Sequence, residues 1–245
     1  MAEPAAPVAS EPYDPDNVLD RLSRRSTLEH HYRHQEARER ALLDRHLRLA
    51  GGRVVSIGAG WHPGRHLFGG PAFRLVAVDA APERVAAVVG SGAADEGHVA
   101  YAGQTGLEPG SFDVVLYRLV LHHIAFQGPL APCFEEAAAL LRPGGALVAI
   151  EPGLWHPVGA ALALANRIGA ATLVHGTPDD IPLSPRTLLR HAHDAGLAPS
   201  LYAVSYGWRR LRPDLQRALA PLDRLGSRPR AAMLGHTLML IAFKD

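Results

Sequence analysis

Residues 53–60 read RVVSIGAG, a run of mostly apolar, β-branched residues that ends in a pair of closely spaced glycines. A second apolar run, LVAVD at residues 75–79, ends in Asp79, which lies 21 positions after Gly58. Strands that are apolar along their whole length are typical of parallel sheets, because helices cover both faces of such a sheet. The two runs therefore predict the first strands of a doubly wound α/β domain.

The same alternation of short apolar runs and helical segments continues to residue 150. Further strands are predicted at residues 98–102, 113–117, 146–150, 201–206 and 237–243, and helices at residues 82–89, 132–141 and 186–195. Pro143-Gly144-Gly145 is a turn that leads into the strand at 146–150. The pattern thus extends the α/β prediction over most of the chain.

The segment before the first strand has a different character. Residues 1–15 (MAEPAAPVASEPYDP) show no periodicity, and we expect a disordered tail. Ser26 and Glu29 have the spacing of a capping box, so a helix is expected from there to about Ala50, before Gly51-Gly52. The chain is accordingly divided into a tail (1–15), an N-terminal helical lid (16–50) and a main domain (51–245) with an inserted lid segment near 153–185.

The composition of the chain argues against several classes of protein. The 245 residues carry a formal net charge of +1, so no overall field draws the chain to nucleic acid or to an anionic membrane. Cys133 is the only cysteine, which excludes an intramolecular disulfide and a cysteine-based metal cluster. The longest apolar stretch, residues 158–174, contains Asn166 and Arg167 and falls short of a membrane span. We therefore expect a cytoplasmic protein without nucleic-acid or membrane partners.

The glycines and the acid together indicate a ligand. Gly58 and Gly60 let the backbone turn tightly and approach a bound molecule, and a following helix would offer free N–H groups. An acid at the end of the second strand, as at Asp79, commonly receives the two hydroxyls of a ribose. The combination favours an adenosine-type ligand. In the alternative interpretation the glycines only make a turn, and Asp79 only caps the next helix.

With these and two further motifs, the chain resembles the class I S-adenosylmethionine-dependent methyltransferases, in particular the small-molecule branch that includes ubiquinone-biosynthesis-type enzymes. The motifs lie within residues 50–208: Gly58–Gly60; Val78–Glu83; Ser111–Val115 with Leu121–Ile124; and Leu141–Gly145 with Glu151-Pro152. The resemblance implies a Rossmann-like doubly wound sheet of seven strands, the last one antiparallel. It also implies S-adenosyl-L-methionine as the cofactor and methyl transfer to a small organic acceptor.

The resemblance also implies cofactor-binding residues. Gly58 and Gly60 would lie beneath the methionine part, Asp79 at the ribose, Gln104 and Thr105 at the adenine, and Arg118 beside the carboxylate end or the substrate; Ser56 and Ala80 complete the cofactor-binding set. Ser56 stands where the family often has an acid that orients the methionine amine or the loop. His62 stands where a third glycine is usual, and the helix expected between Pro63 and Phe68 is short.

Three histidines are candidates for catalysis. Methyl transfer is a direct displacement that needs alignment and exclusion of water, and it needs a base only when the acceptor loses a proton. His122 and His123 follow the fourth strand at the ligand-binding edge of the sheet, and His31 of the lid has Tyr32 beside it. The structural alternative is that these histidines cap a helix or pack beneath the lid. His30 and His34 have the i,i+4 spacing of a metal pair, but no second motif supports it, and no metal is predicted.

Two other functions stay open from the sequence. A non-transferring member of the same fold, such as a cyclase or a ligand-binding module, would share every motif, because fold does not determine function. An NAD(P)-dependent oxidoreductase would also use a glycine turn and an acid, but Pro63 interrupts the position where its third glycine packs helix against strand. Consumption of the cofactor with release of its demethylated product separates these alternatives from methyl transfer.

Overall fold

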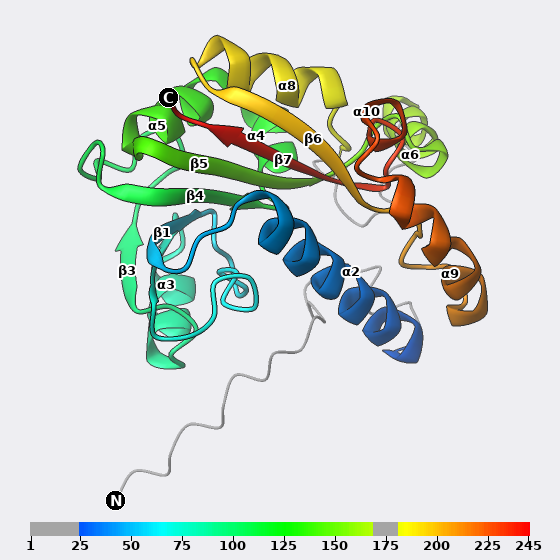
Figure 1. The fold of residues 1–245 in the computed structure, drawn as a ribbon, viewed down its shortest axis with the longest axis horizontal. Coiled ribbons are helices and arrows are strands. Elements are labelled where there is room, and N and C mark those ends of the chain that lie inside the picture. Colours follow the sequence, from blue (N-terminus) through cyan, green and yellow to red (C-terminus); the bar gives the residue numbers. More distant parts are fainter. Residues whose placement is uncertain (1–24, 169–180) are drawn as a thin grey trace, which may run out of the picture.

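A twisted β-sheet with helices on both faces forms the molecule (Figure 1). The structure, a computed structural model, describes residues 25–168 and 181–245. The predicted tail (1–15), the first part of the predicted lid and residues 169–180 of the predicted insertion lie outside the described residues.

The sheet has seven strands in the order β3-β2-β1-β4-β5-β7-β6. Their bounds are β1 Gly52–Ile57, β2 Phe73–Asp79, β3 Glu96–Val99, β4 Phe112–Arg118, β5 Leu141–Pro152, β6 Ala198–Ser205 and β7 Thr237–Phe243. β7 lies between β5 and β6 and is antiparallel to both, whereas β1 to β5 pair in parallel. The predicted doubly wound, seven-stranded sheet with an antiparallel last strand is confirmed.

Helices cover the two faces of the sheet unequally. The described helices are α2 Arg25–His46, α3 Pro82–Gly90, α4 Leu121–Gln127, α5 Ala131–Leu140, α6 Pro157–Arg167, α8 Pro185–Asp194, α9 Pro213–Leu219, the 3-10 helix η1 Ala220–Leu225 and α10 Pro229–Ala232. α5 and α8 pack on one face, and the long α2 crosses the other (Figure 1). Over the described part of the chain, none of these helices has both the length and the apolar character that a membrane span requires.

Alternate residues of each central strand enter opposite cores. In β4, Val115 and Tyr117 pack with α5 and α8, whereas Val114 and Leu116 pack with Leu42 and its neighbours on α2. All four β4 side chains are fully buried. This two-sided burial is the physical reason that the strand reads as a continuous apolar run.

The connection between β1 and β2 departs from the prediction. No helix lies between Pro63 and Phe68; the segment forms turns in which the N–H groups of Leu67 and Phe68 donate to the carbonyl of Gly64. Gly64 has φ +88° and lies so close to Leu116 that an added Cβ would stand 2.5 Å from its side chain. Pro63 and this left-handed glycine prevent a regular helix. The prediction of a helix N-terminus with free N–H groups after Gly60 is therefore wrong.

Two predicted boundaries also shift. α2 already includes Arg25, so Ser26 lies inside the helix and not at its N-cap, and the helix ends at His46, before Arg48 with its φ of +43°. The third strand ends at Val99, where its pairing with Asp79 ends, and not at residue 102. Because helix and strand ends depend on where tertiary pairing stops, local patterns place them only to within a few residues.

Candidate functional site

A cavity of about 700 Å³ opens at the edge of the sheet where the parallel strands end. Its lining comes from α2, from the segments that follow strands β1 to β6, and from the residues around the start of β7. In open α/β sheets, ligands bind outside the carboxyl ends of the strands. The large cavity is thus where this fold is expected to hold its ligand.

The turn after β1 forms one wall of the cavity. Gly58 has φ +66°, and a Cβ at this position would stand 2.3 Å from a methyl group of Val120. Gly60 also has a positive φ, +52°, but a Cβ there would meet nothing within 4 Å. Gly58 is therefore required by both conformation and space, and Gly60 by conformation alone.

Asp79 lies beside this turn with its carboxylate already oriented. One carboxylate oxygen, Oδ2, accepts the N–H of Gly60 at 2.9 Å, and the other, Oδ1, accepts the N–H of Ala81 at 3.0 Å. A carboxylate has about four lone-pair sites, so two remain for the hydroxyls of a ribose. Asp79 is buried yet lines the cavity. The residues fit the adenosine-type cofactor, and the carboxylate also orders the turn and the start of α3.

The other predicted cofactor residues divide into two groups. Ala80 and Arg118 line the cavity. Ser56 is buried in β1, and Gln104 is exposed; neither is part of the lining. Thr105 is also outside it, because its N–H and its hydroxyl both donate to Oε1 of Glu136, at 2.5 Å and 2.7 Å.

Residues nearer to β3 line the cavity where the adenine was expected. These are Ala100, Tyr101 and Ala102. Tyr101 and Gln104 form an isolated β-bridge, and Gly103 between them has φ +81°. This tight turn carries the chain away from the cavity after Ala102, so residues 100–102, and not 104–105, face it.

Arg118 is held by a buried acid of the N-terminal helix that the sequence analysis missed. Glu39 is fully buried, and its carboxylate accepts from Arg118 Nε at 3.1 Å, from His66 Nε2 at 3.0 Å and from Gln35 Nε2 at 2.8 Å. Burial by itself would raise the pKa of Glu39, but Arg118 and His66 outweigh it and lower this pKa to about 2. The acid joins α2 to β4 and to the loop after β1.

His122 is paired with a second buried acid. Its Nδ1 lies 2.6 Å from Glu151 Oε2 at the end of β5, and both residues are buried. The other Glu151 oxygen, Oε1, accepts the N–H groups of Val120 and Leu121 at 2.9 Å and 2.8 Å. Glu151 therefore caps the start of α4 and orients the His122 ring. The ring of His123 lies 4.0 Å from that of His122, and both histidines line the cavity.

The backbone between β4 and α4 is strained at Leu119. This residue has φ +56°, an unusual conformation for any residue other than glycine, and its N–H donates to the carbonyl of Ile150 at 2.8 Å. The sharp turn brings Val120 and His122 over the end of the sheet. Such strain commonly accompanies residues that must be aimed at a ligand.

His31 lies on α2, at the other side of the cavity. It is buried, and its ring packs edge-on against the rings of Tyr32 and His236. Burial, with a smaller contribution from the positive charge of Arg209, lowers the pKa of His31 to about 3. A ring that resists protonation so strongly is a weak base. His31 is thus poorly suited to accept a proton from an acceptor.

No group of three or more potential metal ligands occurs within residues 25–168 and 181–245. His34 Nε2 instead contacts Asp223 Oδ2 at 2.6 Å, which ties α2 to η1. One member of the i,i+4 pair of His30 and His34, namely His34, therefore already has an acid as its partner.

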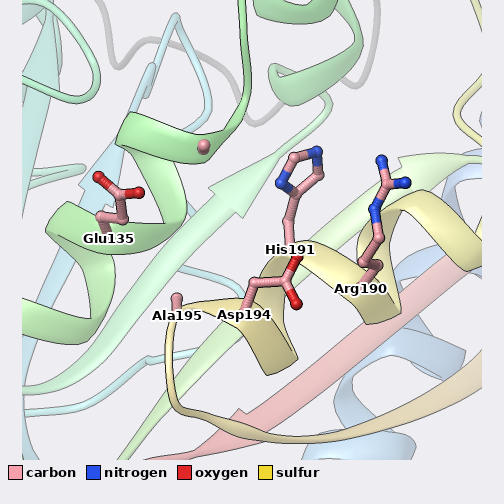
Figure 2. A pocket seen from close by; sticks show the side chains of 6 residues that line it. Glu135, Arg190, His191, Asp194 and Ala195 are labelled. Carbon is pink, nitrogen blue, oxygen red and sulfur yellow. The ribbon is translucent and has the colours of Figure 1, made fainter.

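A second, smaller cavity of about 360 Å³ lies between α5 and α8 (Figure 2). Glu135 extends from α5, and Arg190, His191 and Asp194 extend from α8. This cavity includes none of the predicted site residues and lies against helices, not at the strand ends. The larger cavity therefore remains the candidate site.

Part of the chain resembles a known protein family. Residues 55–149 match a family model described as a methyltransferase domain. They include the Gly58 turn, Asp79, Arg118 and the two histidines after β4. No curated protein matches the chain in sequence.

Several solved structures share the fold. A protein of Thermotoga maritima, described as a SAM-dependent methyltransferase and possible histamine N-methyltransferase, aligns with TM-score 0.62 and 14% identity over 90% of this chain and 92% of its own. Geranyl diphosphate C-methyltransferase of Streptomyces coelicolor aligns with TM-score 0.55 and 19% identity over 86% and 79%. Phosphoethanolamine N-methyltransferase 2 of Haemonchus contortus aligns with TM-score 0.58 and 17% identity over 85% and 52%. At these identities the likeness is one of fold.

Proposed function

We propose that this chain is an S-adenosylmethionine-dependent methyltransferase that acts on a small organic acceptor in the manner of the ubiquinone-biosynthesis-type branch; the match of residues 55–149 to the methyltransferase domain model supports this. The ordered motifs at Gly58, Asp79 and Glu151 support the branch, and the single buried Cys133 suits a reducing cytoplasm. The near-neutral net charge of +1 supports a small molecule over nucleic acid as the acceptor.

One observation carries the proposal. A single cavity has the Gly58 turn and the oriented Asp79 carboxylate at one end, and half-buried aromatic side chains with the buried His31 and His122 toward the other. When bound, S-adenosylmethionine supplies an electrophilic methyl group on a positively charged sulfur. The glycine turn and Asp79 would hold its two ends, so that the methyl group is directed toward the histidine end of the cavity.

The residues of the chain would mainly align the reactants and exclude water. α2 contributes His31, Tyr32, Gln35 and Glu36 to the cavity, and we propose that it acts as the lid predicted from residues 16–50. The segment that begins at Gly153 would form the second part of the lid, since Gly159 and Leu162 also line the cavity. A covered cavity lowers the competition from water for the methyl group.

His122 is the proposed base where the acceptor loses a proton. Glu151 accepts from Nδ1, so in the neutral ring the remaining nitrogen, Nε2, is the atom that takes a proton. The buried carboxylate then stabilises the positively charged ring that forms. His123, beside it, would shape the acceptor's position, and the weak base His31 would serve as a neutral wall.

Calorimetric titration with S-adenosylmethionine and S-adenosylhomocysteine tests the proposal. Both should bind, and Asp79→Ala should weaken binding by about 1–3 kcal/mol, because the ribose hydroxyls lose their acceptor. Asp95→Ala, which changes a more exposed acid near the other end of β2, is the control and should leave affinity unchanged. Absence of binding by the unaltered protein would refute the function. Release of S-adenosylhomocysteine in the presence of an acceptor distinguishes transfer from mere binding.

A further inference from the structure

Positive charge is concentrated in the segment between β6 and β7. Residues 209–230 contain seven arginines and two acids, whereas the whole chain has a net charge of +1. The expectation that the chain has no membrane partner rests on that total, which averages this segment with the net negative remainder. The segment forms α9, η1 and α10 and follows β6, the strand at one edge of the sheet. We call residues 209–234 the basic segment; its helix α9 projects at one end of the molecule (Figure 1).

The inner side of the basic segment is fixed to the end of β6. Asp223 of η1 is buried, and its Oδ1 accepts the N–H of Tyr206 at 3.0 Å. The hydroxyl of Tyr206 donates to the carbonyl of Ala231, in α10, at 2.8 Å. The N–H of Ala203 donates to the carbonyl of Gly226, between η1 and α10, at 2.9 Å. Because η1 and α10 dock on the same few residues of β6, their outer sides adjoin each other.

The outer side carries exposed leucines and arginines. α9 runs directly into η1, so residues seven positions apart are separated by about two helical turns and lie on the same side. Gln216 and Asp223 have this spacing, and both are buried. The residues that flank them are exposed: Leu215, Arg217, Leu222 and Arg224. Leu234, which follows α10, is also exposed. Apolar and cationic side chains therefore alternate on one outward surface.

The acids near this surface already have partners. Asp214 pairs with Arg212 at 3.2 Å, and Asp223 lies on the inner side. Glu29 of α2, the helix that packs against α9, pairs with Arg33 at 3.7 Å. The remaining exposed arginines form no ion pair with any residue in the described part of the chain: Arg217, Arg224, Arg228 and Arg230. Their charges face the solvent together.

The basic segment begins beside one end of the cavity. The acceptor end of the cavity is lined by His31, Tyr32, Trp208, Arg209 and His236, and the ribose end by Gly58 and Asp79. Trp208 immediately precedes the basic segment, and Arg209 is its first residue. A partner that covers the outer side would thus lie next to the acceptor end.

We propose that the basic segment binds the surface of a membrane that contains anionic lipids. Arginines bind lipid phosphates through charge-assisted hydrogen bonds, and the exposed leucines enter the boundary between headgroups and acyl chains. A surface for single-stranded nucleic acid would place aromatic side chains among the arginines for base stacking, whereas the outer side has Leu215, Leu222 and Leu234. The inference names a partner of the chain and does not depend on the proposed function.

Cosedimentation with lipid vesicles tests the proposal. The full chain is mixed at pH 7.5 and low salt with vesicles of phosphatidylcholine alone, or of phosphatidylcholine and phosphatidylglycerol in equal amounts. The chain should bind the phosphatidylglycerol vesicles about tenfold or more tightly, and added salt should weaken this binding because it screens the charges. Equal binding to the two kinds of vesicle, or no binding to phosphatidylglycerol, would overturn the inference.

Arginine variants locate the effect. Arg217→Gln with Arg224→Gln should weaken binding to the phosphatidylglycerol vesicles about 25-fold, since each arginine near an anionic surface contributes about fivefold. Arg186→Gln with Arg190→Gln is the matched control, because it removes the same charge from exposed positions of α8 and should retain the affinity. An equal loss in both double variants would mean that only the overall charge matters, and the basic segment would not be the binding surface.

Leucine variants separate a membrane from other anionic partners. Leu215→Ser with Leu222→Ser should weaken vesicle binding about fivefold or more, because the apolar side chains no longer enter the lipid boundary. Val99→Ser, a similarly exposed position of β3 at the opposite edge of the sheet, should not. All these residues are exposed, so the variants should keep the fold, which circular dichroism checks. Undiminished vesicle binding by the leucine variant, or complete displacement of the vesicles by a single-stranded RNA at equal phosphate concentration, would refute the membrane as partner.

Discussion

The ribose end of the cavity is formed by residues close together in the sequence, whereas the acceptor end combines segments that are far apart. Gly58 and Gly60 lie in the turn after β1 and Asp79 ends the adjacent β2, and the contact between Gly60 and Asp79 spans 19 residues. At the other end, Tyr32 and Arg209 meet across 177 residues. The first end depends on local backbone geometry, and the second on how α2 and the loop after β6 dock onto the sheet.

A third region, the buried cluster around Glu39, connects the two ends. Arg118 at the Gly58 side and α2 at the acceptor side share this one carboxylate. Substitutions in the cluster should therefore lower the stability of the whole molecule, whereas substitutions at either end should mainly affect that end. The following predictions test that order of effects.

Glu39→Gln should have the largest effect on stability. It leaves the buried guanidinium of Arg118 without its compensating charge, which costs about 3–5 kcal/mol of unfolding free energy. Urea denaturation at pH 7 measures this. Glu29→Gln on the same helix removes an exposed ion pair with Arg33 and should cost about 0–1 kcal/mol. Equal losses in the two variants would show that Glu39 is not the connection between the ends.

Gly58→Ala should come next. The left-handed conformation costs about 1–2 kcal/mol for alanine, and the approach to Val120 adds overpacking of about 1–3 kcal/mol. Gly60→Ala, where a Cβ has open space, should show only the conformational cost. Thermal unfolding and S-adenosylhomocysteine titration of the two variants compare them. If Gly60→Ala proves the more harmful, the assignment of the tight approach to Gly58 is wrong.

His31 should make stability depend on pH at the acceptor end. Its pKa is about 3 in the folded protein and ordinarily 6.5, so the unfolded chain binds a proton that the folded chain refuses. Stability is therefore lost as pH falls from 6.5 toward 3, by about 2 kcal/mol between pH 7 and pH 5. Urea denaturation should show this loss reduced by that amount in His31→Gln. The exposed His193→Gln should keep it, and an unchanged loss in His31→Gln would contradict the assignment.

Gln104→Ala should have the smallest effect. The side chain is exposed and outside the cavity lining, so the affinity for S-adenosylhomocysteine should change by about 0.5 kcal/mol or less. Tyr101→Ala, which removes a ring from the lining, is the comparison and should weaken binding more. If Gln104→Ala loses more affinity than Tyr101→Ala, the Gln104 amide does contact the adenine, as the family resemblance implies.

The sequence patterns predicted those features that depend on neighbouring residues. The strands at residues 53–57 and 75–79 were recognisable because both faces are buried, and the left-handed turn was recognisable because it needs glycine at position 58. The absence of a helix after Gly60 was not predicted, although Pro63 and Gly64 signal it. The approach of Gly64 to Leu116 that excludes a side chain there is visible only in the folded chain.

The sequence by itself determined the sheet, the glycine turn and the acid at the end of β2, because periodicity, backbone conformation and strand ends are properties of short segments. Only the tertiary structure decided that Glu39 meets Arg118, that Glu151 holds His122 and that Arg209 reaches the face of Tyr32. These contacts depend on strand order and on the docking of α2, in which residues far apart in the chain become neighbours through burial of shared apolar surface. Nothing in the local pattern around any one of these residues specifies its partner.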